Sequence, residues 1–197
     1  MGDGSSHSNQ VAKRKLALLG ITGVGKTSLA TRFVQRSFKD TYNPTIANTY
    51  HTDVKFGSKI LATEILDTAG MDGSNQIPRH ASVGVHGYIL LYSTISKHSF
   101  KTIININEDL MHELAVLPDV PKVLVGTMND LTDQRQVSPE QGKALAQELG
   151  IPFLECSAKE NFNIDAVFES LIKEVELAQG GAVKEETPPQ QWQCTVA

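Results

Sequence analysis

Residues 20–27 read Gly-Ile-Thr-Gly-Val-Gly-Lys-Thr and match the pattern G-x-x-x-x-G-K-[ST]. The glycines of this pattern let successive backbone N–H groups point at one oxyanion, which makes a cradle for phosphate. Lys26 adds a positive charge near the β- and γ-phosphates, and the Thr27 hydroxyl can ligate Mg²⁺. The stretch therefore predicts a loop that binds the phosphates of a nucleotide.

The flanks of this loop have the character that the pattern requires. The run Lys15-Leu-Ala-Leu-Leu19 before it is short and mainly apolar, which is typical of a buried strand. Residues 28–36 after it can begin a helix, and the N-terminal dipole of a helix favours anions. A chance glycine-rich turn is not expected to have both flanks, so the order strand, loop and helix favours phosphate binding.

The composition indicates one globular domain. The chain has 197 residues, of which 40% are hydrophobic and 20% charged, enough for one well-buried domain but not for two ordinary ones. A formal net charge of −4 gives no reason to expect nucleic acid as a partner. The sequence shows neither a secretory signal nor an apolar run of about 18 residues. Two cysteines make no disulfide framework, so we expect a reducing compartment. We also expect the protein to be a monomer.

Short apolar runs alternate with amphipathic segments between residues 13 and 178. Strands are predicted at 15–20, 49–56, 59–66, 86–93, 121–126 and 152–156. Helices are predicted at 27–37, 97–116, 139–149 and 164–178. This alternation implies a mainly parallel sheet with helices on both faces. We expect residues 1–12 to be a disordered arm and residues 179–197 a flexible tail.

Local patterns refine this architecture. Residues 49–56 alternate between apolar and polar, which predicts a half-buried edge strand. Gly57-Ser58 is a two-residue turn signal, so this strand should pair with 59–66 in an antiparallel hairpin. The apolar run 88–92 predicts a central strand that is covered on both faces. A capped helix start and a glycine stop are predicted from Ser138, Pro139, Gln141 and Gly150.

Further candidate ligands follow the predicted strands, at the edge of the sheet where α/β proteins bind ligands. Asp67 comes after the strand 59–66 and can hold Mg²⁺ through a water, while Gly70 leaves room for a terminal phosphate. Thr45, within Tyr42-Asn-Pro-Thr-Ile46, can offer Mg²⁺ a second hydroxyl when a γ-phosphate is present. Such a segment would order with a triphosphate and loosen after hydrolysis.

Two later segments can read a purine base. The Asp130 carboxylate can accept hydrogen bonds from N1–H and N2–H₂ of guanine, and adenine offers no matching pair of donors. In the segment Ser157-Ala-Lys159, the Ala158 N–H can meet the guanine O6 and the stem of Lys159 can cover the base. Phe38 either packs against the edge of the base or belongs to the core.

Taken in order and spacing, these motifs resemble the Ras superfamily of small GTPases over about residues 13–178. Within it the chain is most similar to the Rheb subfamily, through residues 44–49, 87–93, 142–146 and 154–161. The resemblance implies a P-loop GTPase fold with a six-stranded, mainly parallel sheet, and GTP or GDP with Mg²⁺ as ligands. It also implies GTP-dependent binding to the TOR kinase complex and regulation by a tuberin-type GTPase-activating protein.

The resemblance assigns a set of site residues. Those expected to bind the nucleotide are Gly20, Thr22, Gly23, Val24, Gly25, Lys26, Thr27, Ser28, Phe38, Tyr42, Thr45, Gly70, Thr127, Asp130, Ser157, Ala158 and Lys159. Those expected to hold the metal ion are Thr27, Thr45 and Asp67. The positions that correspond to catalytic ones are Lys26, Thr45 and Met71.

The chain departs from the family pattern at several of these positions. Met71 stands where the family usually has a Gln that orients the attacking water, and a thioether cannot donate a hydrogen bond. Thr22 adds a side chain near the γ-phosphate, so both changes should slow hydrolysis. Thr127 and Met128 replace the usual Asn and Lys of the base motif, and the lost hydrogen bonds could weaken binding about tenfold or more.

The last four residues, Cys194-Thr-Val-Ala197, fit the prenylation pattern C-a-a-X, with a terminal Ala that favours farnesyl. Lys184 is the only basic residue after Lys173, and one lipid chain without a basic patch anchors weakly and reversibly. We therefore expect the protein on the cytoplasmic face of endomembranes or the plasma membrane, with a cytosolic pool.

Three hypotheses of function follow. The first is a membrane-tethered GTP/GDP switch with slow hydrolysis. The second is a pseudo-GTPase, a binding module that does not hydrolyse its nucleotide, which the residues at positions 22, 71, 127 and 128 favour. The third is an ATP-using protein with the same phosphate loop, against which Asp130 argues.

Overall fold

Six strands form one sheet in the computed structural model, which describes residues 12–38, 47–71, 77–114 and 120–180. The strand order is β2-β3-β1-β4-β5-β6. All neighbours run parallel except β2, which lies at one edge and is antiparallel to β3. The predicted six-stranded, mainly parallel sheet is therefore confirmed. The strand bounds are β1 Ala12–Leu19, β2 Ala47–Phe56, β3 Lys59–Thr68, β4 Gly87–Ser93, β5 Lys122–Thr127 and β6 Phe153–Glu155.

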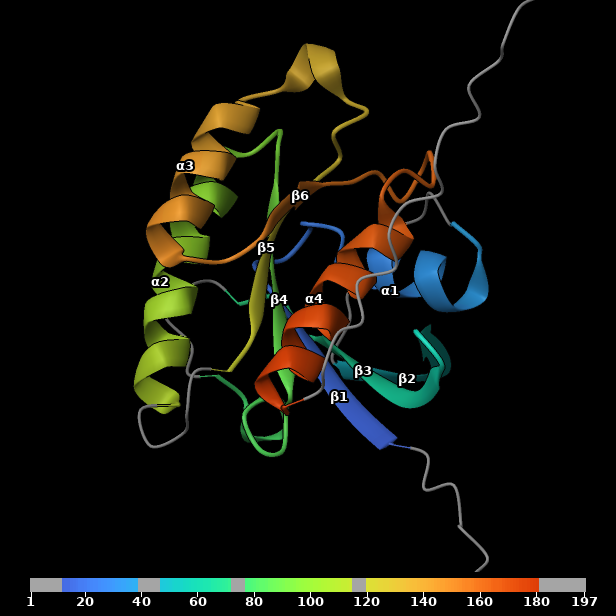
Figure 1. The fold of residues 1–197 in the computed structure, drawn as a ribbon. Coiled ribbons are helices and arrows are strands. Elements are labelled where there is room, and N and C mark those ends of the chain that lie inside the picture. The colour runs from blue at the N-terminus through green and yellow to red at the C-terminus, as the bar shows by residue number, and fades with distance from the viewer. Residues whose placement is uncertain (1–11, 39–46, 72–76, 115–119, 181–197) are drawn as a thin grey trace, which may run out of the picture.

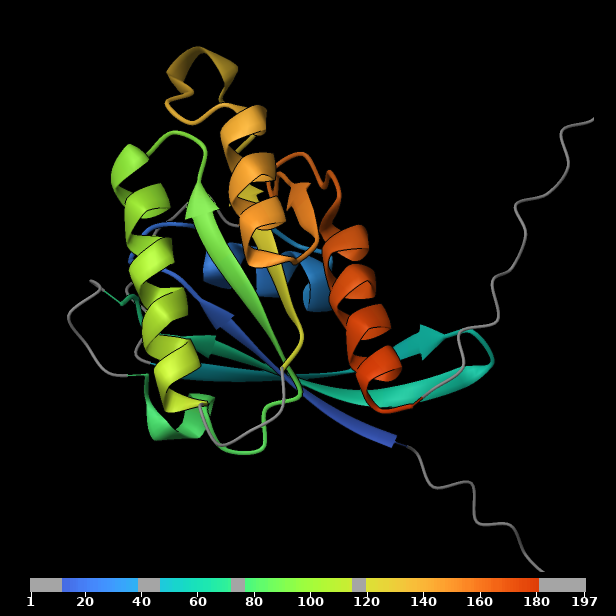
Figure 2. The same cartoon turned by 60° about the vertical axis from the view of Figure 1, so that its left-hand side comes forward.

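Helices cover both faces of the sheet, as Figures 1 and 2 show. One face carries α1 and α4, and the other carries α2 and α3. The helix bounds are α1 Lys26–Gln35, α2 Lys97–Glu113, α3 Pro139–Leu149 and α4 Ile164–Ala178. Two short 3₁₀ helices, η1 Arg79–Ala81 and η2 Thr132–Gln134, lie in connecting loops.

The core consists of two apolar layers, one on each face of the sheet. Successive residues of β1 alternate between them: Leu16 and Leu18 pack on the α1/α4 side, whereas Ala17 and Leu19 pack on the α2/α3 side. Every residue of β4 is buried, as predicted for a central strand with both faces covered. Burial on both faces makes the centre of the sheet rigid, and the loops at its carboxyl edge are built on that support.

The predicted hairpin is confirmed. β2 and β3 pair from Ala47↔Thr68 to Phe56↔Lys59, with Gly57-Ser58 as the turn. Val54 is buried, and Tyr50, Thr52 and Phe56 on the same face are half-buried, whereas His51, Asp53 and Lys55 are exposed. The period-two pattern of the sequence thus identified both the strand and its inward face.

Local capping signals fix the ends of α3. The Ser138 side chain accepts a hydrogen bond from the Gln141 N–H, and the Gln141 side chain accepts one from the Ser138 N–H. Gly150 ends the helix at φ 66°, a left-handed conformation that glycine adopts without strain. The bounds predicted for α3 and α4 are confirmed.

Other predicted bounds need small corrections. The helix predicted at 27–37 begins at Lys26 and ends at Gln35, because Arg36 turns to a left-handed φ of 53°. The helix predicted at 97–116 ends at Glu113. Strand β1 begins at Ala12, inside the predicted arm, because residues 12–15 pair with the start of β3.

Several predictions concern residues outside the described ranges. These are the arm before Ala12, the tail beyond residue 180, and the positions Tyr42, Thr45 and Cys194. In the described part of the chain, no helix has both the length and the apolar character needed to cross a bilayer.

Candidate nucleotide-binding site

The phosphate loop, residues 20–27, lies between the end of β1 and the first turn of α1, as its sequence predicted. Gly23 and Gly25 adopt φ values of 82° and 87°, which side chains with a Cβ rarely tolerate. Gly20 is required for another reason, because a Cβ there would collide with the carbonyl oxygen of Leu91. The loop therefore takes its shape from backbone that only glycine can supply, and it faces the N-terminus of a helix.

The Lys26 side chain binds two backbone carbonyls of the phosphate loop. Its Nζ donates hydrogen bonds of 2.9 Å to the Gly20 carbonyl and 3.0 Å to the Ile21 carbonyl. The side chain is buried, and burial lowers its pKa to about 8, although the nearby charge of Asp67 acts in the opposite direction. Burial removes most of the water around this ammonium group. Charge-assisted hydrogen bonds to a phosphate would replace the lost contacts with water.

Two of the predicted metal ligands meet beside Lys26. The Thr27 hydroxyl donates a 2.7 Å hydrogen bond to Asp67 Oδ2, which brings the start of α1 to the end of β3. Asp67 is only 1% exposed, and burial raises its pKa while the Thr27 hydrogen bond and the Lys26 charge lower it. Its other oxygen, Oδ1, has no hydrogen-bond partner among the described residues. A buried carboxylate oxygen of this kind is suited to accept a hydrogen bond from a water of a hydrated Mg²⁺, so these residues fit the ion.

The segment after β3 lies directly against the phosphate loop. A Cβ at Gly70 would overlap the backbone and hydroxyl of Thr22, so only glycine fits there. The Met71 N–H donates a 3.1 Å hydrogen bond to the Gly20 carbonyl. The structure therefore brings Thr22 and Gly70 together, and their place near a terminal phosphate stays a prediction.

The Met71 side chain packs into the core. It is 3% exposed and belongs to the apolar layer on the α2/α3 side, with Leu19, Leu66 and Ile77. The sequence identified this position as the family's catalytic Gln position but gave no sign of its burial. Because apolar neighbours surround the thioether, the Met71 side chain contributes to core packing. It also has no hydrogen-bond donor with which to orient a water.

Thr127 connects β5 to the phosphate loop. Its hydroxyl donates a 2.7 Å hydrogen bond to the Val24 carbonyl and also lies 3.0 Å from the Tyr92 carbonyl. The Met128 side chain lies nearby: its sulfur accepts a 3.3 Å hydrogen bond from the Ser93 hydroxyl. Thr127, which stands where the family usually has Asn, thus forms a direct hydrogen bond to the phosphate loop.

The two segments predicted to read the base lie side by side. The Asn129 N–H donates a 3.3 Å hydrogen bond to the Cys156 carbonyl, which places Asp130 next to the base loop, residues 157–159. Cys156 is buried, and burial raises the pKa of its thiol to about 12, so the thiol stays protonated. Asp130 is half-buried. A carboxylate with this exposure can reach a bound base, and the base would then shield it from water.

Two contacts of the base loop were missed by sequence reasoning. The guanidinium of Arg32, on α1, donates hydrogen bonds of 2.6 Å to the Ala158 carbonyl and 2.8 Å to the Lys159 carbonyl. The same group lies 5.8 Å from the centre of the Phe38 ring. Phe38 is half-buried and belongs to neither apolar layer of the described core, so its contact with Arg32 favours a place beside the base loop. No sequence pattern indicates these contacts, because they join residues more than 120 positions apart.

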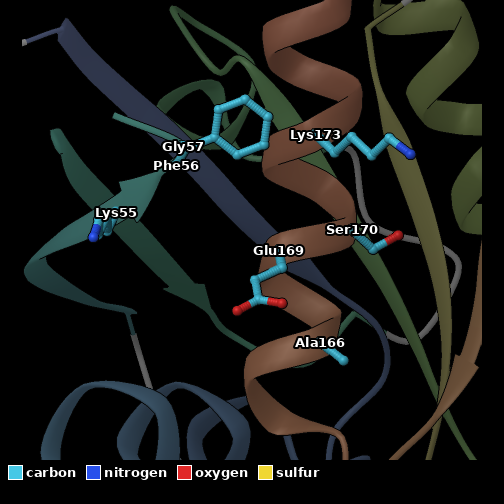
Figure 3. A pocket seen from close by; sticks show the side chains of 7 residues that line it. All are labelled: Lys55, Phe56, Gly57, Ala166, Glu169, Ser170 and Lys173. Carbon is cyan, nitrogen blue, oxygen red and sulfur yellow. The ribbon is translucent and has the colours of Figure 1, made fainter. Parts of the chain in front are cut away.

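A surface pocket of about 500 Å³ lies elsewhere, between the β2–β3 hairpin and α4 (Figure 3). Neither the phosphate loop nor the base loop contributes to its lining, so it is separate from the predicted nucleotide site. The lining residues are Lys55, Phe56, Gly57, Ala166, Glu169, Ser170 and Lys173. The described residues also contain no cluster of three or more His, Cys, Asp or Glu side chains that could hold a metal ion.

Comparison with known proteins agrees with this geometry. Residues 15–177 match the model of the Ras family. The GTP-binding protein Rheb homolog of Dictyostelium discoideum is 37% identical over 92% of this chain and 95% of its own length. The GTP-binding protein rhb1 of Schizosaccharomyces pombe is 40% identical over 84% of this chain and 89% of its own. Human GTP-binding protein Rheb is 40% identical over 88% of this chain and 94% of its own.

The family match spans the phosphate loop, the Thr27–Asp67 pair, Asp130 and the base loop. The relatives align with 84–92% of the chain, at identities high enough to show the family. The chain therefore belongs to the Ras family of small GTPases, and within it is similar to Rheb.

Proposed function

We propose that the protein is a Rheb-like, membrane-tethered GTP/GDP switch that hydrolyses GTP slowly. The observation that supports this proposal is the cluster of Lys26, Thr27 and Asp67 beside the phosphate loop. One carboxylate oxygen of Asp67 has no hydrogen-bond partner among the residues that the structure describes. A buried cation and a buried anion beside a row of backbone amides are suited to a triphosphate and its metal ion.

Each group has a distinct task in hydrolysis. A water attacks the γ-phosphorus, the bond to the bridging oxygen of GDP breaks, and inorganic phosphate leaves. Lys26 and the amides of the phosphate loop stabilise the negative charge on the phosphate oxygens during this step. Thr27, Thr45 and Asp67 would hold Mg²⁺, which neutralises charge on those oxygens when bound.

Slow hydrolysis follows from the groups that this chain lacks. At position 71 a thioether packs into the core, so no side-chain amide is available there to orient the water. Thr22 lies against Gly70, in the region expected to meet the terminal phosphate. These features affect the orientation of the attacking water and leave the phosphate-binding groups in place.

Partners and location are extended from the resemblance. We infer GTP-dependent binding to the TOR kinase complex and regulation by a tuberin-type GTPase-activating protein, because the relatives are Rheb proteins. A farnesyl group on Cys194 would tether the protein weakly to the cytoplasmic face of a membrane, with a cytosolic pool.

A second candidate is a pseudo-GTPase that binds nucleotide without hydrolysing it, which the burial of Met71 favours. Single-turnover hydrolysis of GTP by the full chain separates the two. We expect a measurable rate below the roughly 10⁻⁴ s⁻¹ of an unassisted small GTPase. GTP that stays intact over several days would contradict the switch and support the second candidate.

A further inference from the structure

Two sets of hydrogen bonds hold the base loop, one from its neighbours in the sequence and one from α1. Ser157 and Phe162 exchange two backbone hydrogen bonds, of 3.1 and 2.9 Å, and the Ser157 hydroxyl accepts a 3.0 Å hydrogen bond from the Glu160 N–H. These contacts fix the ends of the loop through its own neighbours. They leave the carbonyls of Ala158 and Lys159 to be held by another part of the chain.

Arg32 supplies that support from α1. Its Nε and Nη2 atoms donate to the carbonyls of Ala158 and Lys159, so one planar guanidinium binds two successive peptide groups. A rigid fork of donors fixes the orientation of its acceptors more tightly than a single donor can. The Phe38 ring beside the guanidinium and a third hydrogen bond, from Nη1 to the Arg36 carbonyl at 3.3 Å, hold the fork in turn.

The Ala158 amide lies between these anchors. Ser157 is fixed on its N-terminal side and the Ala158 carbonyl on its C-terminal side, so the direction of the Ala158 N–H is determined by both. Within the described residues this N–H donates no hydrogen bond, and it is the group predicted to meet the guanine O6. Arg32 thus acts on the atom that would read one edge of the base.

We propose that Arg32 is a positioning residue for guanine recognition, which holds the base loop so that the Ala158 N–H faces the O6 atom. This inference rests on the proposed guanine-nucleotide site. Thr127 donates no hydrogen bond to the base loop, because its single hydroxyl hydrogen is directed to the Val24 carbonyl of the phosphate loop.

The test uses nucleotides that differ only at the edge of the base. GDP has O6, N1–H and the 2-amino group, whereas 2-aminopurine riboside diphosphate keeps the 2-amino group and lacks both O6 and N1–H. Dissociation constants of both are measured with Mg²⁺ for the wild type and for R32M, which keeps an apolar stem but has no donor. We expect R32M to bind GDP about tenfold more weakly and the analogue within twofold of the wild type.

Matched variants keep the test decisive. R36M changes the arginine directly after α1, whose side chain pairs with Asp165 at 2.6 Å, and should leave both affinities unchanged. R32K retains the charge without the fork, and is expected to lose part of the discrimination. If R32M does not fold, R32K carries the comparison.

The outcomes separate the inference from the function on which it rests. Equal weakening of GDP and the analogue by R32M, or no weakening of either, would overturn the role of Arg32. Failure of the wild type to bind GDP would instead overturn the proposed function, and the inference with it. Loss of discrimination confined to the Arg32 variants supports both.

Discussion

Thr27 and Asp67, which lie 40 residues apart in the sequence, are joined by a hydrogen bond of 2.7 Å from the threonine hydroxyl to the aspartate carboxylate. Thr27 lies in the first turn of α1 and Asp67 near the end of β3, so the bond connects a helix to a strand at the carboxyl edge of the sheet. Asp67 keeps a second oxygen without a partner in the described part of the chain. This pair therefore marks the place where the predicted metal ion and the phosphates would meet.

The first prediction concerns the dependence of nucleotide binding on magnesium. In the wild type, removal of Mg²⁺ with a chelator should speed the release of GDP. D67N should reduce the affinity for Mg²⁺ by about 10- to 100-fold, because a neutral amide holds the hydrated ion less well. Release of a fluorescent GDP, followed with and without chelator, measures the effect.

D165N is the matched control, because Asp165 is an exposed carboxylate whose partner is Arg36. Its chelator response should equal that of the wild type. If the chelator sped the release of GDP from D67N as strongly as from the wild type, Asp67 would not contribute to Mg²⁺ binding.

The second prediction concerns the support of the phosphate loop. T127V keeps the shape of the side chain but leaves the Val24 carbonyl without its 2.7 Å donor, at a cost of about 1–3 kcal/mol. We expect GDP to dissociate about tenfold faster or more. T63V removes a buried hydrogen bond to the Leu61 carbonyl, away from the loop, and should lower stability without changing the dissociation rate. Equal dissociation rates in both variants would refute this role of Thr127.

The third prediction concerns Met71. Because its side chain is buried among apolar residues, M71A should lower the free energy of unfolding by about 2–5 kcal/mol. M71L nearly conserves the volume and should cost less than about 1.5 kcal/mol. Urea unfolding at a fixed excess of GDP measures both changes. If M71A were as stable as the wild type, the side chain would not pack as described.

Sequence reasoning was most successful where the determining interactions are local. The phosphate loop, the hairpin around Gly57 and the capped start of α3 each depend on residues within a few positions of one another. The contacts of Arg32 and the burial of Met71 depend on how distant elements pack, and neither leaves a pattern in the sequence. The positions Thr127 and Met128 were recognised as unusual, but the retained bond to Val24 became visible only in three dimensions.

The fourth prediction concerns pH and His86. Its Nδ1 accepts a 3.0 Å hydrogen bond from the Lys15 N–H, so Nδ1 carries no proton and the ring is neutral. Burial lowers the pKa of His86, as do the charges of Arg14 and Lys15, while the charge of Glu176 acts in the opposite direction. Below a pH of about 6.5 the unfolded chain therefore binds more protons than the folded one at this residue, and stability falls as pH decreases.

The measurement compares the wild type with H86N, whose amide oxygen can accept the same hydrogen bond without titrating. Between about pH 7.5 and 5.5 the free energy of unfolding should decrease more steeply for the wild type than for H86N. Parallel pH profiles of the two proteins would show that His86 does not contribute to the loss.

The central claim is that the phosphate loop, Asp67 and Asp130 together form a site for a guanine nucleotide with magnesium. Isothermal titration of the full chain, freed of nucleotide, with GDP and with ADP in the presence of Mg²⁺ tests it most directly. The account predicts tight binding of GDP with one site per chain, and binding of ADP at least about a hundredfold weaker. No heat of binding with GDP, or an affinity for ADP equal to that for GDP, would contradict it.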